Sequence, residues 1–226
     1  MLVGAVVQGG VGFGLGMIAS PFLVWLYPDQ MPGAMIMLGG TTALTVLVVD
    51  WRSLDLTGLG WALLGRLPGV ALGAWLVVRV PLALTGVLVG LAVLAAVALQ
   101  WSGRTIHQTP GTLVGAGFVS GTSGTVSGIG GPPLAMVYAG QAGPVVRATL
   151  AAYFIVGTAT SLAALGVVGR LSWDQFGLAV VLVPALILGN LLALPLARLL
   201  DSGHTRRSIL LLAGLAGALL VVTSLH

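Results

Sequence analysis

Two short stretches of the chain place glycine, proline and small hydroxyl side chains inside long apolar runs. They cover residues 11–27 and 122–138, and a shift of about half the chain superposes them, matching Pro21 with Pro132 and Tyr27 with Tyr138. Glycine and proline at this density interrupt a regular helix. Since the start of an interrupted helix carries unpaired N–H groups and a partial positive charge, the chemistry that these stretches favour is the binding of a small anion.

The candidate ligands of this anion are the small residues of the two stretches and two arginines. Hydroxyl donors occur at Ser123, Thr125 and Ser127, where the first stretch has only glycines, so we expect the second stretch to supply more direct ligands. Arg66 lies inside an apolar run, where a charge costs at least about 2.5 kcal/mol and is usually kept for function. Arg147 follows the second stretch and could attract or gate the anion. The predicted substrate-binding residues are Gly12, Gly14, Gly16, Ser20, Pro21, Thr122, Ser123, Thr125, Ser127, Gly128, Gly130, Gly131, Pro132, Arg147 and Arg66.

These residues also have structural interpretations. Glycines four residues apart commonly mark close helix packing, which is the role we favour for the glycines of residues 65–73 and 86–90. Arg66 could extend to a membrane interface, and Arg147 could be a topology anchor. The hydroxyls of residues 41–45 and 158–161 could face a cavity or bond to their own helix carbonyls. Packing alone does not explain residues 121–133, which hold five glycines and two adjacent prolines.

The composition places these stretches in an integral membrane protein. Of the 226 residues, 58% are hydrophobic and 6% are charged, whereas a soluble surface needs roughly a quarter charged residues. Long continuous apolar runs favour spanning helices over the alternating strands of a β-barrel. The absence of cysteine excludes disulfides and thiolate metal sites, and we expect neither a metal nor a cofactor. The net charge of +4 comes from arginines between the apolar runs and reflects topology, not nucleic-acid binding.

About eight apolar runs of membrane-spanning length must position the candidate ligands. They cover residues 2–26, 33–49, 57–78, 82–101, 111–140, 147–168, 173–200 and 206–225. The second half repeats the first beyond the two broken stretches, since residues 68–73 match residues 184–189. We therefore predict an all-α integral membrane protein of two four-segment repeats, residues 1–103 and 104–226, with segments one and five broken or re-entrant.

The arginine distribution favours inverted repeats. If segments one and five each enter and leave on one face, the loop arginines divide six to two between the faces; if both segments cross fully, the division is five to three and the repeats are parallel. Arginine collects on the cytoplasmic face of membrane proteins. We therefore prefer the inverted arrangement and keep the parallel one as the alternative.

Residues 10–22 and the run Gly128-Ile-Gly-Gly-Pro-Pro133 resemble the signature stretches of the sulfite exporter TauE/SafE family. The resemblance extends over nearly the whole chain, including the duplicated eight-segment layout. It implies a membrane transporter, linked to export or uptake of sulfite, sulfonates and related organic anions, in which the two broken stretches form the substrate path. This chain has no long central loop, which leaves regulation and assembly open.

The sequence leaves two functions to consider as alternatives to transport. Gly121-Thr-Ser-Gly124 resembles the motif of rhomboid-like intramembrane serine proteases, but no histidine lies in an apolar run to serve as the base for Ser123, so we expect no enzyme activity. An anion channel stays open as a second alternative. All five Asp residues fall at the ends of the runs, and no Asp, Glu or His lies deep enough in the membrane to relay protons, so we expect the membrane potential to drive export, gaining about 4.6 kcal/mol per divalent anion at 100 mV.

The expected partners are a small anionic substrate and the lipid bilayer, without nucleic acid. The expected location is the bacterial cytoplasmic (inner) membrane, which the chain would cross several times. A homodimer is open, and Gly86 and Gly90 offer it a smooth face.

Overall fold

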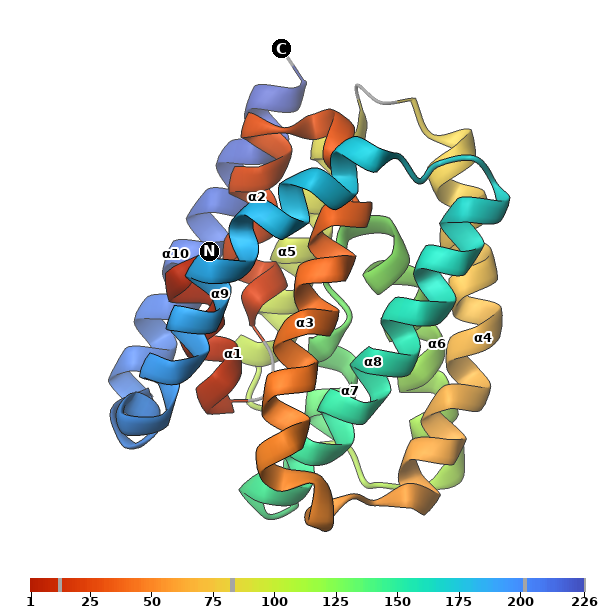
Figure 1. Ribbon diagram of the computed structural model, residues 1–226. Coiled ribbons are helices and arrows are strands. Elements are labelled where there is room, and N and C mark those ends of the chain that lie inside the picture. Colours follow the sequence, from red (N-terminus) through yellow and green to blue (C-terminus); the bar gives the residue numbers. More distant parts are fainter. Residues whose placement is uncertain (12–13, 82–83, 201–202, 226) are drawn as a thin grey trace.

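The computed structural model describes residues 1–11, 14–81, 84–200 and 203–225, which form helices joined by short loops and no strand (Figure 1). The helices are α1 (Leu2–Val11), α2 (Leu15–Leu26), α3 (Gly33–Asp50), α4 (Leu56–Arg79), α5 (Thr85–Trp101), α6 (Pro110–Ser127), α7 (Gly131–Val137), α8 (Gly143–Val167), α9 (Trp173–Leu200) and α10 (Gly203–Ser224), with short 3-10 turns η1 (Pro28–Gln30) and η2 (Trp51–Ser53). The all-helical fold class predicted from the sequence is confirmed for this part of the chain.

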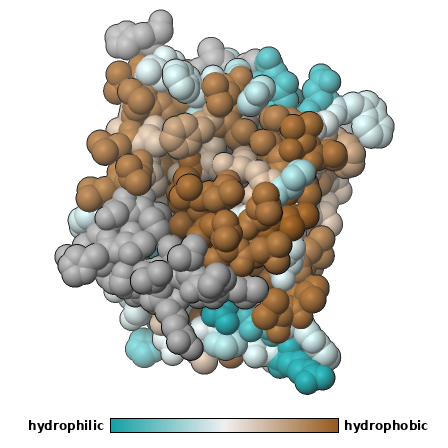
Figure 2. Space-filling model, turned by 60° about the vertical axis from the view of Figure 1, so that its left-hand side comes forward, coloured by the Kyte–Doolittle hydropathy of each residue, from teal (hydrophilic) through white to brown (hydrophobic). Residues whose placement is uncertain are grey.

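Several of these helices have the character of membrane spans. Within the described ranges, four are long and apolar enough to cross a bilayer: α3 extended by η2, α4, α8 and residues 173–193 of α9. The apolar helices α2, α5 and residues 210–224 of α10 are shorter. Apolar side chains cover the middle of the face seen in Figure 2, and hydrophilic side chains gather at its two ends. This belt fits a hydrocarbon core between two aqueous faces, so the chain is a multi-pass membrane protein.

Each of the two glycine-rich and proline-rich stretches contains the end of one helix and the start of another. In the second, α6 ends at Ser127, Gly128 adopts a left-handed φ of 75°, and α7 begins at Gly131. In the first, α2 begins directly after Gly14, whose φ is 127°. Residues other than glycine avoid both φ values, which explains why glycine occupies each position. The predicted ligand Gly12 lies outside the described residues.

The start of α6 and the end of α7 lie next to each other. The N–H of Ile106 donates to the carbonyl of Met136 at 3.1 Å. Gln108, in the loop before α6, and Tyr138, directly after α7, both donate to the carboxylate of Asp55, at 2.8 and 3.0 Å. The chain therefore leaves α7 beside the point at which it entered α6.

Glycines let pairs of helices approach backbone to backbone. A Cβ added to Gly65 or Gly69 of α4, or to Gly117 of α6, would overlap a carbonyl of the facing helix. The close-packing role favoured for the glycines of α4 therefore agrees with their contacts. Gly86 and Gly90, suggested from the sequence as a face for a homodimer, instead pack against α10 of the same chain.

Candidate functional site

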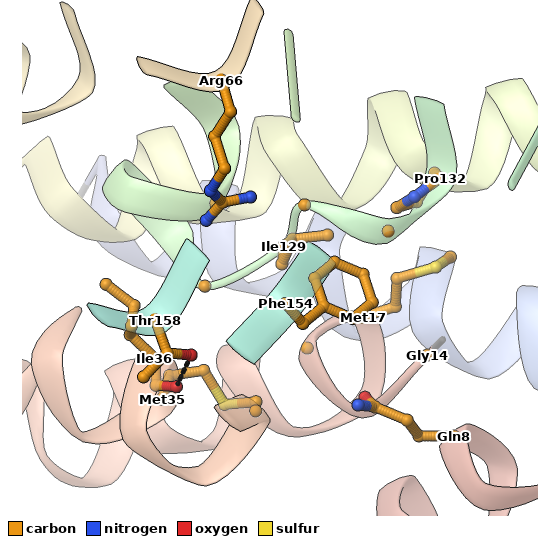
Figure 3. A pocket seen from close by; sticks show the side chains of 16 residues that line it. Gln8, Gly14, Met17, Met35, Ile36, Arg66, Ile129, Pro132, Phe154 and Thr158 are labelled. Carbon is orange, nitrogen blue, oxygen red and sulfur yellow. Dashed lines mark hydrogen bonds between the residues drawn. The ribbon is translucent and has the colours of Figure 1, made fainter. Parts of the chain in front are cut away.

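A small cavity of about 50 Å³ lies beside the two helix breaks (Figure 3). This volume suits a solute of a few atoms, since pockets for drug-sized ligands measure roughly 300–1,000 Å³. The cavity is lined by Gln8, Gly14, Gly16, Met17, Met35, Ile36, Gly39, Arg66, Gly124, Gly128, Ile129, Gly130, Gly131, Pro132, Phe154 and Thr158. Seven of the fifteen predicted binding residues are among them: Gly14, Gly16, Gly128, Gly130, Gly131, Pro132 and Arg66.

The two breaks meet through glycine backbone. A Cβ added to Gly16, in the first turn of α2, would lie 2.6 Å from the carbonyl oxygen of Gly128. A Cβ added to Gly130 would lie 2.9 Å from the carbonyl oxygen of Ser120 in α6. A side chain at Gly16 would push the two breaks apart, and one at Gly130 would push the start of α7 away from α6, so main chain forms the cavity wall at both positions.

Hydroxyl groups close the break between α6 and α7. Ser123 donates to the carbonyl of Ile129 at 2.8 Å, and Ser120 donates to that of Gly130. Ser127 donates to the carbonyl of Ser123 at 2.7 Å and accepts from the N–H of Ile129 at 3.3 Å. The hydroxyls therefore satisfy carbonyls that an interrupted helix would leave unpaired. Ser123 and Ser127, predicted as substrate ligands, do not line the cavity.

The other predicted hydroxyl ligands also bond to main chain. Thr122 donates to the carbonyls of Gly69 and Phe118, and Thr125 donates to the carbonyl of Gly121 at 2.8 Å. Ser20 of α2 donates to the carbonyl of Ser127 at 3.1 Å and so links the two breaks. None of the three lines the cavity. Pro21 is also absent from the lining and lies within α2, about two turns beyond the break.

Arg66 is the charged residue of the cavity wall. It lies in the middle of α4, is only 4% exposed, and directs its guanidinium toward the cavity (Figure 3). Its Nε and Nη1 have no hydrogen-bond partner, and its Nη2 lies 3.4 Å from the hydroxyl oxygen of Ser161. Its Cζ lies 4.6 Å from the centre of the Tyr153 ring. Of the two interpretations that the sequence left open for Arg66, extension to the membrane interface is excluded by this burial.

The charge of Arg66 has no carboxylate partner in the described part of the chain, where the ion pair found is that of Arg147 with Asp50, at 2.7 Å. Burying a charge without a counter-ion is strongly unfavourable, and a bound anion removes that cost. Arginine also offers several N–H donors in one plane, which match the oxygens of a carboxylate or a sulfur oxyanion. The cavity can therefore bind a small oxyanion through Arg66.

Arg147 lies away from the cavity. Its ion pair joins the first turns of α8 to the last residue of α3, and its side chain is 29% exposed. This position agrees with the anchoring role considered for Arg147 in the sequence. The structure therefore separates the two arginines, with Arg66 at the cavity and Arg147 at the end of the bundle.

The sequence interpretation missed several lining residues. Gln8 accepts from the N–H of Leu15 at 3.2 Å and so pairs the first amide of α2. Its signal was the lone amide side chain in the first apolar run. Thr158, whose hydroxyl donates to the carbonyl of Ile36 at 3.2 Å, lines the cavity, as one alternative allowed. By contrast, Thr41, Thr42, Thr45 and Thr160 bond back to carbonyls of their own helices. Met17, Met35 and Phe154 carried no signal, because apolar residues are everywhere in such a chain.

A polar network covers one end of the bundle. Asp55 caps α4 by accepting from the N–H of Gly58 at 2.9 Å, and also accepts from Gln108 and Tyr138. Burial raises the pKa of Asp55, but the hydrogen bonds from Gly58, Tyr138, Gln108 and Thr57 outweigh it and lower the pKa below its ordinary value of 3.8. Asp55 is therefore a stable carboxylate that holds the ends of α4 and α7 together.

A second cavity, of about 160 Å³, lies at the opposite end of the bundle. Its lining includes Arg170, Val126 and Met31. Val126 precedes Gly128 of the central cavity by two residues, and Met31 precedes Met35 by about one helical turn, so the two cavities lie close together.

Comparison with models of known protein families gives a match over nearly the whole chain. The family model described as "Sulfite exporter TauE/SafE" matches residues 1–220. No curated protein and no solved structure matches the chain.

Proposed function

Because the chain belongs to the sulfite exporter TauE/SafE family, we propose that it carries sulfite, sulfonates or related small organic anions across the bacterial cytoplasmic membrane, with the anion paired to Arg66 in the central cavity. The observation that carries this proposal is the guanidinium of Arg66, almost fully buried, facing a cavity and without a counter-ion among the described residues. The glycine-lined breaks beside it let an anion approach the main chain closely.

The two halves are inverted repeats in this proposal. The adjacent ends of α6 and α7 support it, because a segment that returns to its own face gives each half an odd number of crossings. Helix packing supports the division into two related halves, whichever way they are oriented. In the two repeats, α1, α3, α4 and α5 correspond to α6, α8, α9 and α10. The packed pair α4 and α6 therefore corresponds to the pair α9 and α1, which also packs together. The pairs α3 with α8 and α5 with α10 each join two corresponding helices.

The anion leaves the cell in this proposal. Arg52, Arg104 and Arg147 belong to the end of the bundle closed by the Asp55 network, and Arg79 and Arg170 to the opposite end, which supports a cytoplasmic location for the closed end. The second cavity would then open outward. A cell that is negative inside favours outward movement of an anion by about 2.3 kcal/mol per charge at 100 mV.

The decisive experiment measures saturable sulfite flux in proteoliposomes for the wild type and for Arg66→Ala, Arg66→Lys and the control Arg79→Ala. We expect Arg66→Ala to abolish saturable flux, Arg66→Lys to raise KM, and Arg79→Ala to keep saturable flux, because Arg79 is exposed and lines neither cavity. Wild-type KM and Vmax in Arg66→Ala would contradict the proposed site.

The same vesicles test the direction and the mode of transport. A membrane potential that is negative inside should accelerate the exit of trapped sulfite, and external sulfite should exchange with labelled internal sulfite. Flux that depends on a proton gradient and ignores voltage would reject the proposed driving force. Flux without saturation or exchange would indicate a channel.

A further inference from the structure

One face of α8 holds the guanidinium of Arg66. Tyr153, Gly157 and Ser161 follow one another at intervals of four residues, and therefore lie on the same face of that helix. The centre of the Tyr153 ring is 4.6 Å from Cζ of Arg66, and the hydroxyl oxygen of Ser161 is 3.4 Å from Nη2. A Cβ added to Gly157 would overlap Cζ, so the absence of a side chain at this position makes room for the guanidinium.

Tyr153 is itself held in place. Its side chain is 1% exposed, and its hydroxyl donates to the carbonyl of Gly117 in α6 at 3.1 Å. Its ring also meets the ring of Phe154 edge-on, with centroids 5.7 Å apart. The ring is therefore a fixed support, because both its polar end and its edge are in contact with other groups.

An aromatic ring and a carboxylate hold a guanidinium in different ways. A carboxylate neutralises the charge and accepts its N–H donors, which would compete with an incoming anion. A ring attracts the cation through its electron-rich face, without accepting the N–H donors in strong hydrogen bonds. The unpartnered Nε and Nη1 of Arg66 agree with the second case.

We propose that Tyr153 is a positioning residue for transport. Its ring fixes Arg66 at the cavity and leaves the charge of the guanidinium free to pair with the transported anion. This inference rests on the proposed function. Gly157 is the second part of the arrangement, because only a residue without a side chain lets the guanidinium lie against α8.

The test separates the ring of Tyr153 from its hydroxyl. Sulfite uptake into proteoliposomes gives KM and Vmax for each variant, and thermal unfolding of the same preparation gives its stability. Tyr153→Phe keeps the ring and loses the hydrogen bond to Gly117, so we expect KM within about twofold of the wild type and a lower melting temperature. Tyr153→Leu loses the ring, and we expect KM to rise at least about fivefold.

Gly157→Ala tests the same idea without altering Tyr153. The added methyl group must displace the guanidinium, so KM should rise as in Tyr153→Leu. Gly166→Ala is the matched control in the same helix, because its nearest neighbour would be a methyl carbon of Leu171 at 3.9 Å. Gly166→Ala should keep the KM of the wild type.

Each result decides between distinct conclusions. The positioning role is overturned if Tyr153→Leu keeps the wild-type KM, or if Tyr153→Phe raises KM as much as Tyr153→Leu does. If Tyr153→Leu does not fold, equal KM values for Gly157→Ala and Gly166→Ala overturn it. In these cases loss of flux in Arg66→Ala leaves the proposed function standing, whereas wild-type flux in Arg66→Ala removes both.

Discussion

Replacing Arg66 with methionine should stabilise the protein when no anion is bound. Methionine is unbranched and apolar, so it can follow the path of the arginine stem without the charge. Arg66 is only 4% exposed, and two of its guanidinium nitrogens have no hydrogen-bond partner among the described residues. Burying such a charge costs at least about 2.5 kcal/mol on insertion scales, while the contact with the Tyr153 ring returns up to about 2 kcal/mol.

The expected net gain in the free energy of unfolding is about 1–3 kcal/mol, in the range found when buried charges are replaced by apolar groups. For a chain of this length, 1 kcal/mol moves the melting temperature by roughly 2–4 °C. Arg66→Met in detergent, in a buffer without sulfate or phosphate, should therefore melt about 2–12 °C above the wild type.

Added sulfite should stabilise the wild type and remove most or all of this difference. At a concentration of 100 times Kd, a ligand stabilises the protein that binds it by about 2.7 kcal/mol, which is roughly 5–10 °C here. The wild type should show this increase and Arg66→Met should show none. An Arg66→Met variant that melts below the wild type without anion would refute the reasoning, because Arg66 would then hold the helices together by contacts of its own.

Three further predictions concern the helix breaks and the closed end of the bundle. Gly16→Ala should lose about 1–3 kcal/mol of stability in chemical unfolding, because its Cβ would lie 2.6 Å from the carbonyl oxygen of Gly128. The control Gly60→Ala should lose none, because no described atom lies within 4 Å of its added Cβ, and equal losses in the two variants would contradict the backbone contact. Because its pKa is depressed, the Asp55 carboxylate stabilises the folded wild type above pH 3.8, and this contribution is lost as the pH falls through the folded pKa. The melting temperature of Asp55→Asn should therefore fall less than that of the wild type between pH 6 and pH 3. Ser123→Ala should lose about 0.5–1.5 kcal/mol of stability and still transport sulfite; a complete loss of flux in a folded variant would assign Ser123 a direct role.

The sequence predicts the breaks because their cause is local. Gly128 needs a left-handed φ, and two prolines follow it within a few residues, so no continuous helix fits there. The apolar runs likewise predict the helices, because length and hydropathy alone decide whether a segment can cross a bilayer. The packing of Gly65 and Gly69 follows from their spacing for the same local reason.

The direction of each side chain depends on distant parts of the chain and could not be predicted. Ser123 was expected to face a substrate, but the break that encloses it leaves the carbonyl of Ile129 within 2.8 Å, and the hydroxyl bonds there. Arg66 could have reached an interface or a cavity from its sequence position alone. Its direction is decided by Gly157 and Tyr153 of α8, far along the chain, which provide the space and the ring that receive the guanidinium.

No carboxylate of the described residues pairs with Arg66, and this also bears on turnover. A transporter must bind its substrate strongly enough to select it and weakly enough to release it. A guanidinium that already pairs with a carboxylate would add little to the binding free energy of an anion. A guanidinium without packing contacts would change its position when the anion left. The Tyr153 ring and the space at Gly157 keep the guanidinium in place in both conditions, because neither contact depends on the anion. The binding free energy is therefore spent on the charge pair and not on ordering a long side chain, which favours rapid binding and release.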